Sequence, residues 1–254
     1  MENIADLGII IQARSGSTRL PSKMTLPFFN NHGILELLLS RLGRAGLADK
    51  IIVATTENSR DDIICGIARN AGVEYYRGNE CDVLDRFIHA AKYYRVSKII
   101  RVCADNPFLD IPALNELITL GMDTDMDYVS HCISSGIPTI KTHYGFWAEY
   151  VTVKALEKVA EQTNESVYHE HVTNYIYTHP DSFKIRLIPI PTTLEKRRIR
   201  LTIDTSDDFQ MQQSIYNAVH NDNKDFQIKD VVDYLDRNAE LYLAMDKLIE
   251  TNEK

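Results

Sequence analysis

Short apolar segments alternate with segments of helical spacing along the first half of the chain, and this rhythm constrains the fold most. The apolar segments are 7–13, 51–55, 73–76 and 98–103, and the helical ones are about 34–42, 58–72, 83–94 and 112–121. Unbroken apolar runs of this length are typical of strands buried on both faces of a parallel sheet. Strands joined by helices form right-handed βαβ crossovers. The sequence therefore predicts a three-layer α/β/α, Rossmann-like fold with a mostly parallel sheet.

The second half of the chain departs from this rhythm. A strand is expected at 128–130, and Gly136 and Pro138 then indicate an irregular excursion, an arm or lid within about 130–180. The remaining expected elements are helices at 154–162 and 168–178, strands at 183–190 and 199–203, and helices at 209–219 and 228–248. Because no linker or low-complexity run divides the chain, residues 1–254 are expected to form a single domain.

The charge and cysteine content limit the partners. Lys and Arg total 28 against 36 Asp and Glu, a net charge of -8, which disfavours sequence-independent nucleic-acid binding. The apolar segment 7–13 is too short to span a bilayer, and the acidic residues before it differ from a signal peptide. The four cysteines have no zinc-site spacing and are expected to be reduced core thiols. We therefore expect a cytoplasmic protein with no nucleic-acid or membrane partner.

The loop after the first expected strand has the composition of a phosphate-binding loop. Ligands of open parallel sheets bind beyond the carboxyl ends of the strands, where residues 12–23 read QARSGSTRLPSK. Arg14, Arg19 and Lys23 supply positive charge, while Ser15 and Gly16 allow backbone N–H groups to approach a phosphate closely. The loop contains neither GxxxxGK[ST] nor GxGxxG, which argues against a P-loop NTPase and a dinucleotide dehydrogenase. A solvated basic turn is the competing interpretation.

Two acids follow apolar segments at positions where a metal ion could be held. Asp105 lies after the segment 98–103, and Asp204 lies after 199–203. Such carboxylates can coordinate Mg²⁺ that bridges nucleotide phosphates. Asp105 is equally well explained by a turn or cap before Pro107, and Asp204 stands beside an expected helix start where Thr205 or Ser206 would be the cap.

Six motifs in order resemble one family. IIIQARSGSTRLPSK, ATTENSRDD, RGNECDVLDRF, ADNPFLD, HEHVTNYI and RLTIDTSDDF extend from about Ile9 to Phe209 and resemble relatives of spore coat polysaccharide biosynthesis protein F, a group similar to CMP-KDO and CMP-sialic acid synthetases. The resemblance implies a nucleotidyltransferase fold and a cytidylyltransferase. Such an enzyme uses CTP and Mg²⁺ to convert a sugar acid into a CMP-sugar for cell-surface polysaccharide or glycan synthesis, with release of pyrophosphate. A homodimer with contacts in 130–180 is also implied.

The resemblance also assigns roles to individual residues. By resemblance, the cations that bind the triphosphate are Arg14, Arg19 and Lys23, and together with Asp105 they form the expected catalytic set. The expected metal-binding acids are Asp105 and Asp204. The other expected nucleotide contacts are Ala13, Ser15, Gly16, Thr55 and Thr56, and the expected acceptor contacts are Glu149, His169 and His171. His169 stands where related sequences often have Arg, so the acceptor is a point where this chain can differ.

Three other interpretations compete. The acceptor could be a phosphorylated small molecule, giving a CDP-linked product. A glycosyltransferase would use the DxD patterns at 123–127 as its metal site, although these precede an expected strand instead of following one. A subunit that binds nucleotide without catalysis is the third. His169 and His171 are poor partners for one metal, since side chains two residues apart on a helix point in very different directions.

Overall fold

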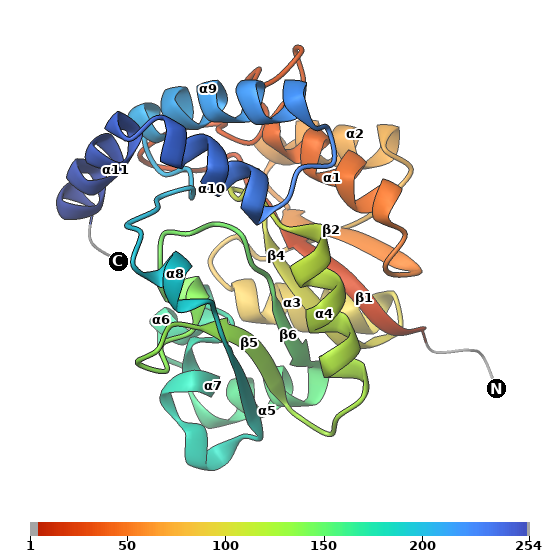
Figure 1. The fold of residues 1–254 in the computed structure, drawn as a ribbon. Coiled ribbons are helices and arrows are strands. Elements are labelled where there is room, and N and C mark those ends of the chain that lie inside the picture. The colour runs from red at the N-terminus through yellow and green to blue at the C-terminus, as the bar shows by residue number, and fades with distance from the viewer. Residues whose placement is uncertain (1–4, 253–254) are drawn as a thin grey trace.

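The computed structural model describes residues 5–252, in which seven strands form one sheet (Figure 1). The strand order is β3-β2-β1-β4-β6-β5-β7. Only β6 among these strands runs antiparallel to its neighbours, β4 and β5. The strands are β1 (Ala5–Gln12), β2 (Lys50–Thr56), β3 (Glu74–Gly78), β4 (Val96–Cys103), β5 (Tyr128–Cys132), β6 (Glu149–Thr152) and β7 (Ile185–Pro189). The predicted mostly parallel α/β sheet is confirmed.

Helices cover both faces of this sheet, as the three-layer prediction requires. On β1, Ile9 and Ile11 point to one face and Ile10 to the other, because side chains alternate along a strand. The first face packs against α1 (Ile34–Ala45), α2 (Asp62–Asn70) and α4 (Ile111–Met122). The second packs against α3 (Val83–Tyr93), α5 (Val153–Gln162) and α7 (Asn174–Thr178).

The C-terminal helices build a third apolar cluster around Phe28, Phe108 and Tyr216. They are α9 (Ser206–Asp222), α10 (Ile228–Arg237) and α11 (Glu240–Thr251), and Figure 1 shows α9 and α10 side by side near α1. The short elements are α6 (Ser166–Glu170), α8 (Thr192–Glu195) and the 3-10 turns η1 (Ser59–Asp61), η2 (Thr139–Lys141) and η3 (Pro180–Ser182).

Several expected elements differ from the structure. The strand predicted at 199–203 is wrong: Leu201 N–H donates to the His143 carbonyl and Ile203 N–H to the Asp105 carbonyl, so this apolar segment bonds to loops. The helix predicted at 168–178 is two short helices. The helix at 228–248 is also two, because Asn238 between them has a non-helical backbone (φ -127°, ψ 64°).

The segment 130–180 contributes directly to the sheet. β6 pairs with both β4 and β5 and so lies inside the sheet, and α5, which follows it, covers one face. The sequence did not suggest β6, whose four residues are too few for a periodic pattern. The irregular part of the segment is the loop between β5 and β6, which contains η2.

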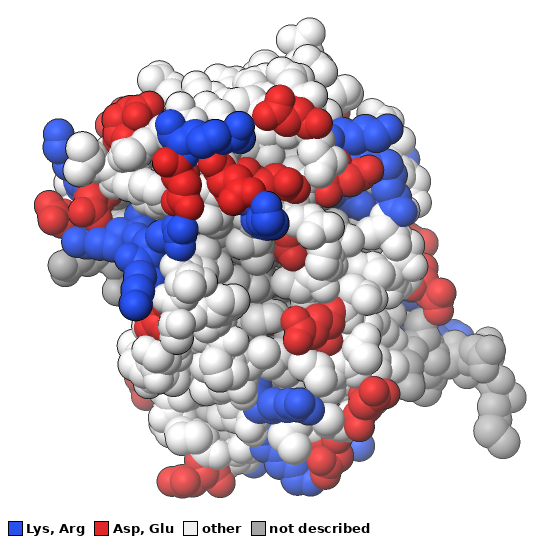
Figure 2. All heavy atoms as spheres, in the orientation of Figure 1, with Lys and Arg blue, Asp and Glu red and all other residues white. Residues whose placement is uncertain are grey.

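The cysteine and surface features are partly as expected. Cys65 and Cys132 are buried and unpaired, but the prediction of a core thiol is wrong for Cys81, which is exposed. Figure 2 shows acidic and basic side chains interspersed on the face viewed in Figure 1. Within residues 5–252, none of the helices is long and apolar enough to cross a membrane.

The strand order places a topological switch point between β1 and β4. From β1 the chain adds β2 and β3 on one side, then returns to add β4 on the other. Gln12 and Cys103, the last residues of β1 and β4, are paired in register. The loops that follow these two strands therefore diverge from one point at the carboxyl edge, where open α/β sheets bind their ligands.

Candidate active site

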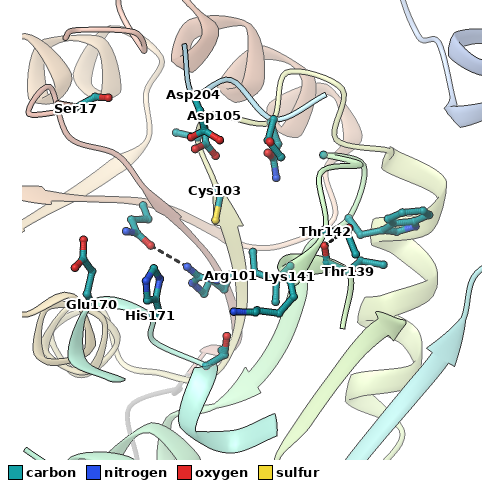
Figure 3. A pocket seen from close by; sticks show the side chains of 18 of the residues that line it. Ser17, Arg101, Cys103, Asp105, Thr139, Lys141, Thr142, Glu170, His171 and Asp204 are labelled. Carbon is teal, nitrogen blue, oxygen red and sulfur yellow. Dashed lines mark hydrogen bonds between the residues drawn. The ribbon is translucent and has the colours of Figure 1, made fainter. Parts of the chain in front are cut away.

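A cavity of about 560 Å³ opens at this switch point. Its walls come from the loops after β1 and β4, from η2, from the segment between α6 and α7, and from the loop before α9. Figure 3 shows Asp105 and Asp204 together at one end, and Arg101, Lys141 and His171 at the other. Of the predicted site residues, the cavity is lined by Arg14, Arg19, Lys23, Asp105, His171 and Asp204.

Lys23 lies between the two acids that the sequence singled out. Its ammonium is 3.0 Å from Asp105 Oδ2 and 3.7 Å from Asp204 Oδ1, and it donates to the Ile203 carbonyl. The Lys23 side chain is only 9% exposed, so the charge is held in place. Arg19, which is more exposed, reaches Asp204 Oδ1 at 3.0 Å. Residues more than 80 positions apart thus meet in one cluster of opposite charges.

Asp61 holds the loop after β1 in place through hydrogen bonds. Ser15 N–H donates to Asp61 Oδ1 at 2.7 Å, and the Thr56 hydroxyl donates to Asp61 Oδ2. Burial raises the pKa of Asp61, but these hydrogen bonds to the charged form outweigh burial, and the pKa lies below its ordinary value. Asp61 is fully buried and lies at the start of α2.

The remaining expected nucleotide contacts lie behind the cavity wall. Ala13 is buried and its N–H donates to the Ala54 carbonyl, while Thr55 and Thr56 are fully buried at the end of β2. Gly16 packs against the Arg60 side chain. None of these residues, nor Ser15, lines the cavity. In the described structure they shape the loop that presents Arg14, Arg19 and Lys23.

Neither metal-site candidate is a helix cap. Asp110 caps α4 by accepting from Ala113 N–H, and Thr205 caps α9 by accepting from Asp208 N–H. Asp105 and Asp204 therefore turn their carboxylates toward the cavity, where both approach the same ammonium group. Two carboxylates that already share one cation are suitable ligands for a hard divalent ion such as Mg²⁺. Within residues 5–252, no group of three or more His, Cys, Asp or Glu is arranged so that it could hold a metal ion by itself.

A buried ion pair supports the loop that carries Asp204. Arg200 and Asp208 are both fully buried, and the guanidinium donates to the carboxylate through Nε at 2.7 Å and Nη2 at 2.8 Å. Asp208 also accepts from the backbone N–H groups of Asp204 and Thr205, at 3.0 and 2.9 Å. These contacts hold the Asp204 backbone in place.

The expected acceptor residues separate into three positions. His171 lines the cavity. His169 lies outside its lining, where Nδ1 contacts Asp82 Oδ2 at 2.7 Å and Nε2 contacts the Thr163 carbonyl at 3.0 Å. Glu149 is buried beneath the cavity floor, paired with Arg101. His171 lies just after the end of α6, with a non-helical backbone (φ -102°, ψ 75°), so the spacing of a regular helix does not relate the two rings.

Sequence reasoning missed several lining residues. Arg101 had a signal, because an arginine inside the apolar segment 98–103 is unusual for a buried strand. Lys141 and Glu170 had none, since exposed charged residues are ordinary in loops and short helices. Glu170 contacts Arg14 at 3.3 Å and so joins the loop after β1 to the segment between α6 and α7 in the cavity wall.

Comparisons with known proteins identify the family and the fold. A family model described as cytidylyltransferase matches residues 8–245. The spore coat polysaccharide biosynthesis protein SpsF of Bacillus subtilis is 31% identical over 92% of this chain and 96% of its own. A cytidylyltransferase structure from Leptospira borgpetersenii serovar Hardjo-bovis is 30% identical, with a TM-score of 0.84 over 94% of this chain and 97% of that one. A CMP:2-keto-3-deoxy-manno-octonic acid synthetase complexed with CTP shares the fold (TM-score 0.63, 12% identity, 84% and 99% covered).

Proposed function

Because this chain belongs to the cytidylyltransferase family and is thus a nucleotidyltransferase, we propose that it transfers CMP from CTP to a small acceptor and releases pyrophosphate. The acceptor is a sugar acid destined for cell-surface polysaccharide or glycan. The observation that carries the proposal is the meeting of Lys23, Asp105 and Asp204 in one cavity at the switch point. The name of the Bacillus relative supports a polysaccharide pathway, and the CTP-bound structure of the shared fold supports the nucleotide.

Arg14, Arg19 and Lys23 bind the triphosphate in this proposal. All three line the cavity and each is paired with a carboxylate. As negative charge develops on the departing pyrophosphate, fixed cations stabilise it more than the ground state, which is the usual origin of electrostatic catalysis. The acceptor oxygen attacks the α-phosphate in line, the bond to the β-phosphate oxygen breaks, and CMP is transferred without a covalent enzyme intermediate.

Asp105 and Asp204 hold Mg²⁺ in this proposal. A bound divalent ion would neutralise phosphate charge and lower the pKa of the acceptor hydroxyl. No protein group is needed as a general base.

The other parts of the proposal concern assembly and location. We infer a homodimer formed through 130–180, since Ile137 and Val167 in this segment are 45% and 44% exposed. Light scattering that finds a monomer would contradict the dimer. We also infer that the reaction takes place in the cytoplasm, as expected from the sequence.

The glycosyltransferase alternative has little structural support. Asp125 is exposed and paired with Lys184 at the amino end of β5, on the opposite edge of the sheet from the cavity. A phosphorylated acceptor remains chemically compatible with the cavity and belongs in the substrate panel.

The test is pyrophosphate release in the presence of Mg²⁺, with each of the four nucleoside triphosphates and a panel of sugar acids and sugar phosphates. We expect release with CTP and one acceptor class. Asp105→Asn and Asp204→Asn are each expected to lower turnover at least about a hundredfold, the scale seen when an electrostatic group is removed from an active site. Asp125→Asn makes the same change of charge outside the cavity and is the matched control.

Each contrary outcome has a defined meaning. Turnover within a few-fold of wild type in both cavity variants would refute the metal assignment. A loss of pyrophosphate release in Asp125→Asn as large as in the cavity variants would refute the assignment of the reaction to the cavity. Tight CTP binding without release from any acceptor would favour a subunit that binds nucleotide without catalysis.

A further inference from the structure

The cavity has a second charged end that the proposed reaction does not use. Figure 3 shows Arg101, Lys141 and His171 on the side away from Asp105 and Asp204, with Cys103 between the two ends. Arg101 and Cys103 lie on the same face of β4, because residues two apart in a strand share a face. Arg101 and Asp105 are four residues apart, so their Cα atoms are separated by at most about 13 Å along this edge.

Arg101 is fixed in place as a donor. Its side chain is 6% exposed, and it contacts Glu149 Oε2 at 2.5 Å and Gln12 Oε1 at 3.1 Å. Glu149 is itself held by hydrogen bonds from the hydroxyls of Tyr128 and Thr173, at 2.5 and 2.9 Å. The guanidinium therefore has little freedom to turn away from the cavity that it lines.

One donor of this rigid group is unused. Within residues 5–252, Arg101 Nε is buried and has no hydrogen-bond partner. A buried donor left without an acceptor is costly, so the guanidinium keeps unused hydrogen-bonding capacity beside the cavity that the residue lines. Although burial alone would lower it, the pKa of Arg101 is raised by its neighbours Cys103 and Glu149, so the group stays charged.

Lys141 gives this end its net charge. The Arg101 charge is balanced by Glu149, and Arg14 is paired with Glu170. Lys141 comes from η2, is exposed, and forms no ion pair with any residue of the described chain. The ammonium is therefore the excess positive charge at this end of the cavity, and Figure 3 shows it on the same side as Arg101 and the His171 ring.

We propose that Arg101, Lys141 and His171 bind an anionic group of the acceptor, a carboxylate or a phosphate, at the end remote from the oxygen that attacks CTP. This inference rests on the proposed function, from which it takes the identity of the ligand as the acceptor. It narrows the acceptor class to molecules that carry their negative charge several bonds from the reacting hydroxyl. A planar guanidinium with an adjacent ammonium matches the geometry of either anion.

The test measures binding without turnover. The protein is first saturated with Mg²⁺ and α,β-methylene-CTP, which cannot transfer CMP and which fills the Arg14 side of the cavity. D-glucuronate, D-glucose 6-phosphate and D-glucose are then titrated by calorimetry. We expect one of the charged sugars to bind and glucose not to bind; the better of the two probes tells a carboxylate site from a phosphate site.

Lys141→Gln is expected to weaken binding of the charged sugar about tenfold, as loss of a charge-assisted hydrogen bond would. Because Lys141 is exposed, this variant does not depend on repacking. Lys224→Gln removes the same charge from an exposed position outside the cavity and is expected to bind as wild type.

Equal binding of glucose and the charged sugars, no saturable binding of either charged sugar, or equal affinities in the Lys141 and Lys224 variants would each overturn the inference. Failure of the CTP analogue to bind in the first titration would instead refute the proposed function. The dependence of sugar binding on Lys141 is then measured in the protein without nucleotide.

Discussion

Removal of the Asp208 charge is expected to destabilise the protein strongly. Asp208 and Arg200 are fully buried, with both guanidinium contacts at 2.7–2.8 Å. In Asp208→Asn the shape is kept, but the buried Arg200 guanidinium loses the carboxylate that it contacts through two nitrogens. Asp204 Oδ2, which lies 3.5 Å from Arg200 Nη2, remains as one longer contact to the guanidinium but accepts no hydrogen bond from Nε.

The expected size follows from this burial. Breaking a fully buried pair by removing one partner costs about 3–5 kcal/mol, and since Asn keeps one acceptor oxygen we expect about 3 kcal/mol. For a chain of this size each kcal/mol lowers the melting temperature by about 2–4 °C, so Asp208→Asn is expected to melt about 6–12 °C below wild type. The adjacent, exposed Asp207 offers the control, because Asp207→Asn is expected to stay within about 0.5 kcal/mol.

The loss of stability in Asp208→Asn is also expected to depend on pH. Burial raises the pKa of Asp208, but hydrogen bonds and charge from Arg200 more than offset it, and the pKa lies below its model-peptide value of 3.8. A carboxyl group whose folded-state pKa is depressed contributes stability that is present above its unfolded pKa and lost as pH falls through the folded value. The difference between wild type and Asp208→Asn is therefore expected to be constant from pH 7 to 5 and to shrink below about pH 4.

Urea unfolding followed by circular dichroism, at pH 7 and at pH 5 and 3.5, measures both quantities. The reasoning is refuted if Asp208→Asn and Asp207→Asn unfold within about 1 kcal/mol of each other at pH 7, because a buried guanidinium that keeps only the longer contact to Asp204 should cost more than that. A gap that widens toward low pH would refute the pKa argument alone.

Three further changes test the cavity and its loops. Lys23→Gln removes the ammonium from between two carboxylates, so Mn²⁺ measured by electron paramagnetic resonance should bind the nucleotide-free protein several-fold more tightly; unchanged Mn²⁺ affinity would contradict the geometry. Asp61→Ala leaves a buried N–H and a buried hydroxyl without an acceptor, worth about 1–3 kcal/mol, so the loop loosens and calorimetry should give about tenfold weaker CTP binding. Gly145→Ala places a side chain at φ +72° with its Cβ 2.4 Å from the Leu201 carbonyl oxygen, so urea unfolding should show a free energy of unfolding lower by more than about 2 kcal/mol. Gly46→Ala is the control: its φ is +60° and its Cβ meets open space, so the loss should be about 1 kcal/mol.

The sheet could be predicted from the sequence where the apolar runs are long. The strands and helices around Ile9, Ile52 and Ile100 were found because buried parallel strands are uniformly apolar and their helices are periodic. β6 could not be predicted, because four residues are too few to show a period. A strand at 199–203 was predicted because Leu201 and Ile203 alternate with polar residues, but their N–H groups donate to the loop carbonyls of His143 and Asp105. Alternation of apolar and polar residues indicates which side chains are buried. It does not show which backbone carbonyls accept from the N–H groups of the segment, because those carbonyls lie elsewhere in the chain.

The site residues could be predicted where charged residues directly follow a strand in the sequence. Arg14, Lys23 and Asp105 lie in loops at the carboxyl edge, so parallel topology alone brings them together. His169 was assigned to the acceptor by resemblance, and the structure gives both of its ring nitrogens other partners, Asp82 and the Thr163 carbonyl. Lys141 could not be found because only the tertiary path of the loop between β5 and β6 carries it to the cavity.

Under the proposed function, the pairing of cations and acids in the cavity implies that metal and nucleotide would bind together. Arg19 and Lys23 contact Asp204 and Asp105, so a triphosphate that binds these cations must take them from the carboxylates. The carboxylates, once released, regain their affinity for a divalent ion, and the ion in turn lowers the charge that the triphosphate brings. Coupling of this kind is reciprocal, so Mg²⁺ should tighten CTP binding by the factor by which CTP tightens Mg²⁺ binding. An acidic protein can in this way keep a cluster of cations for phosphate without presenting a basic surface to other polyanions.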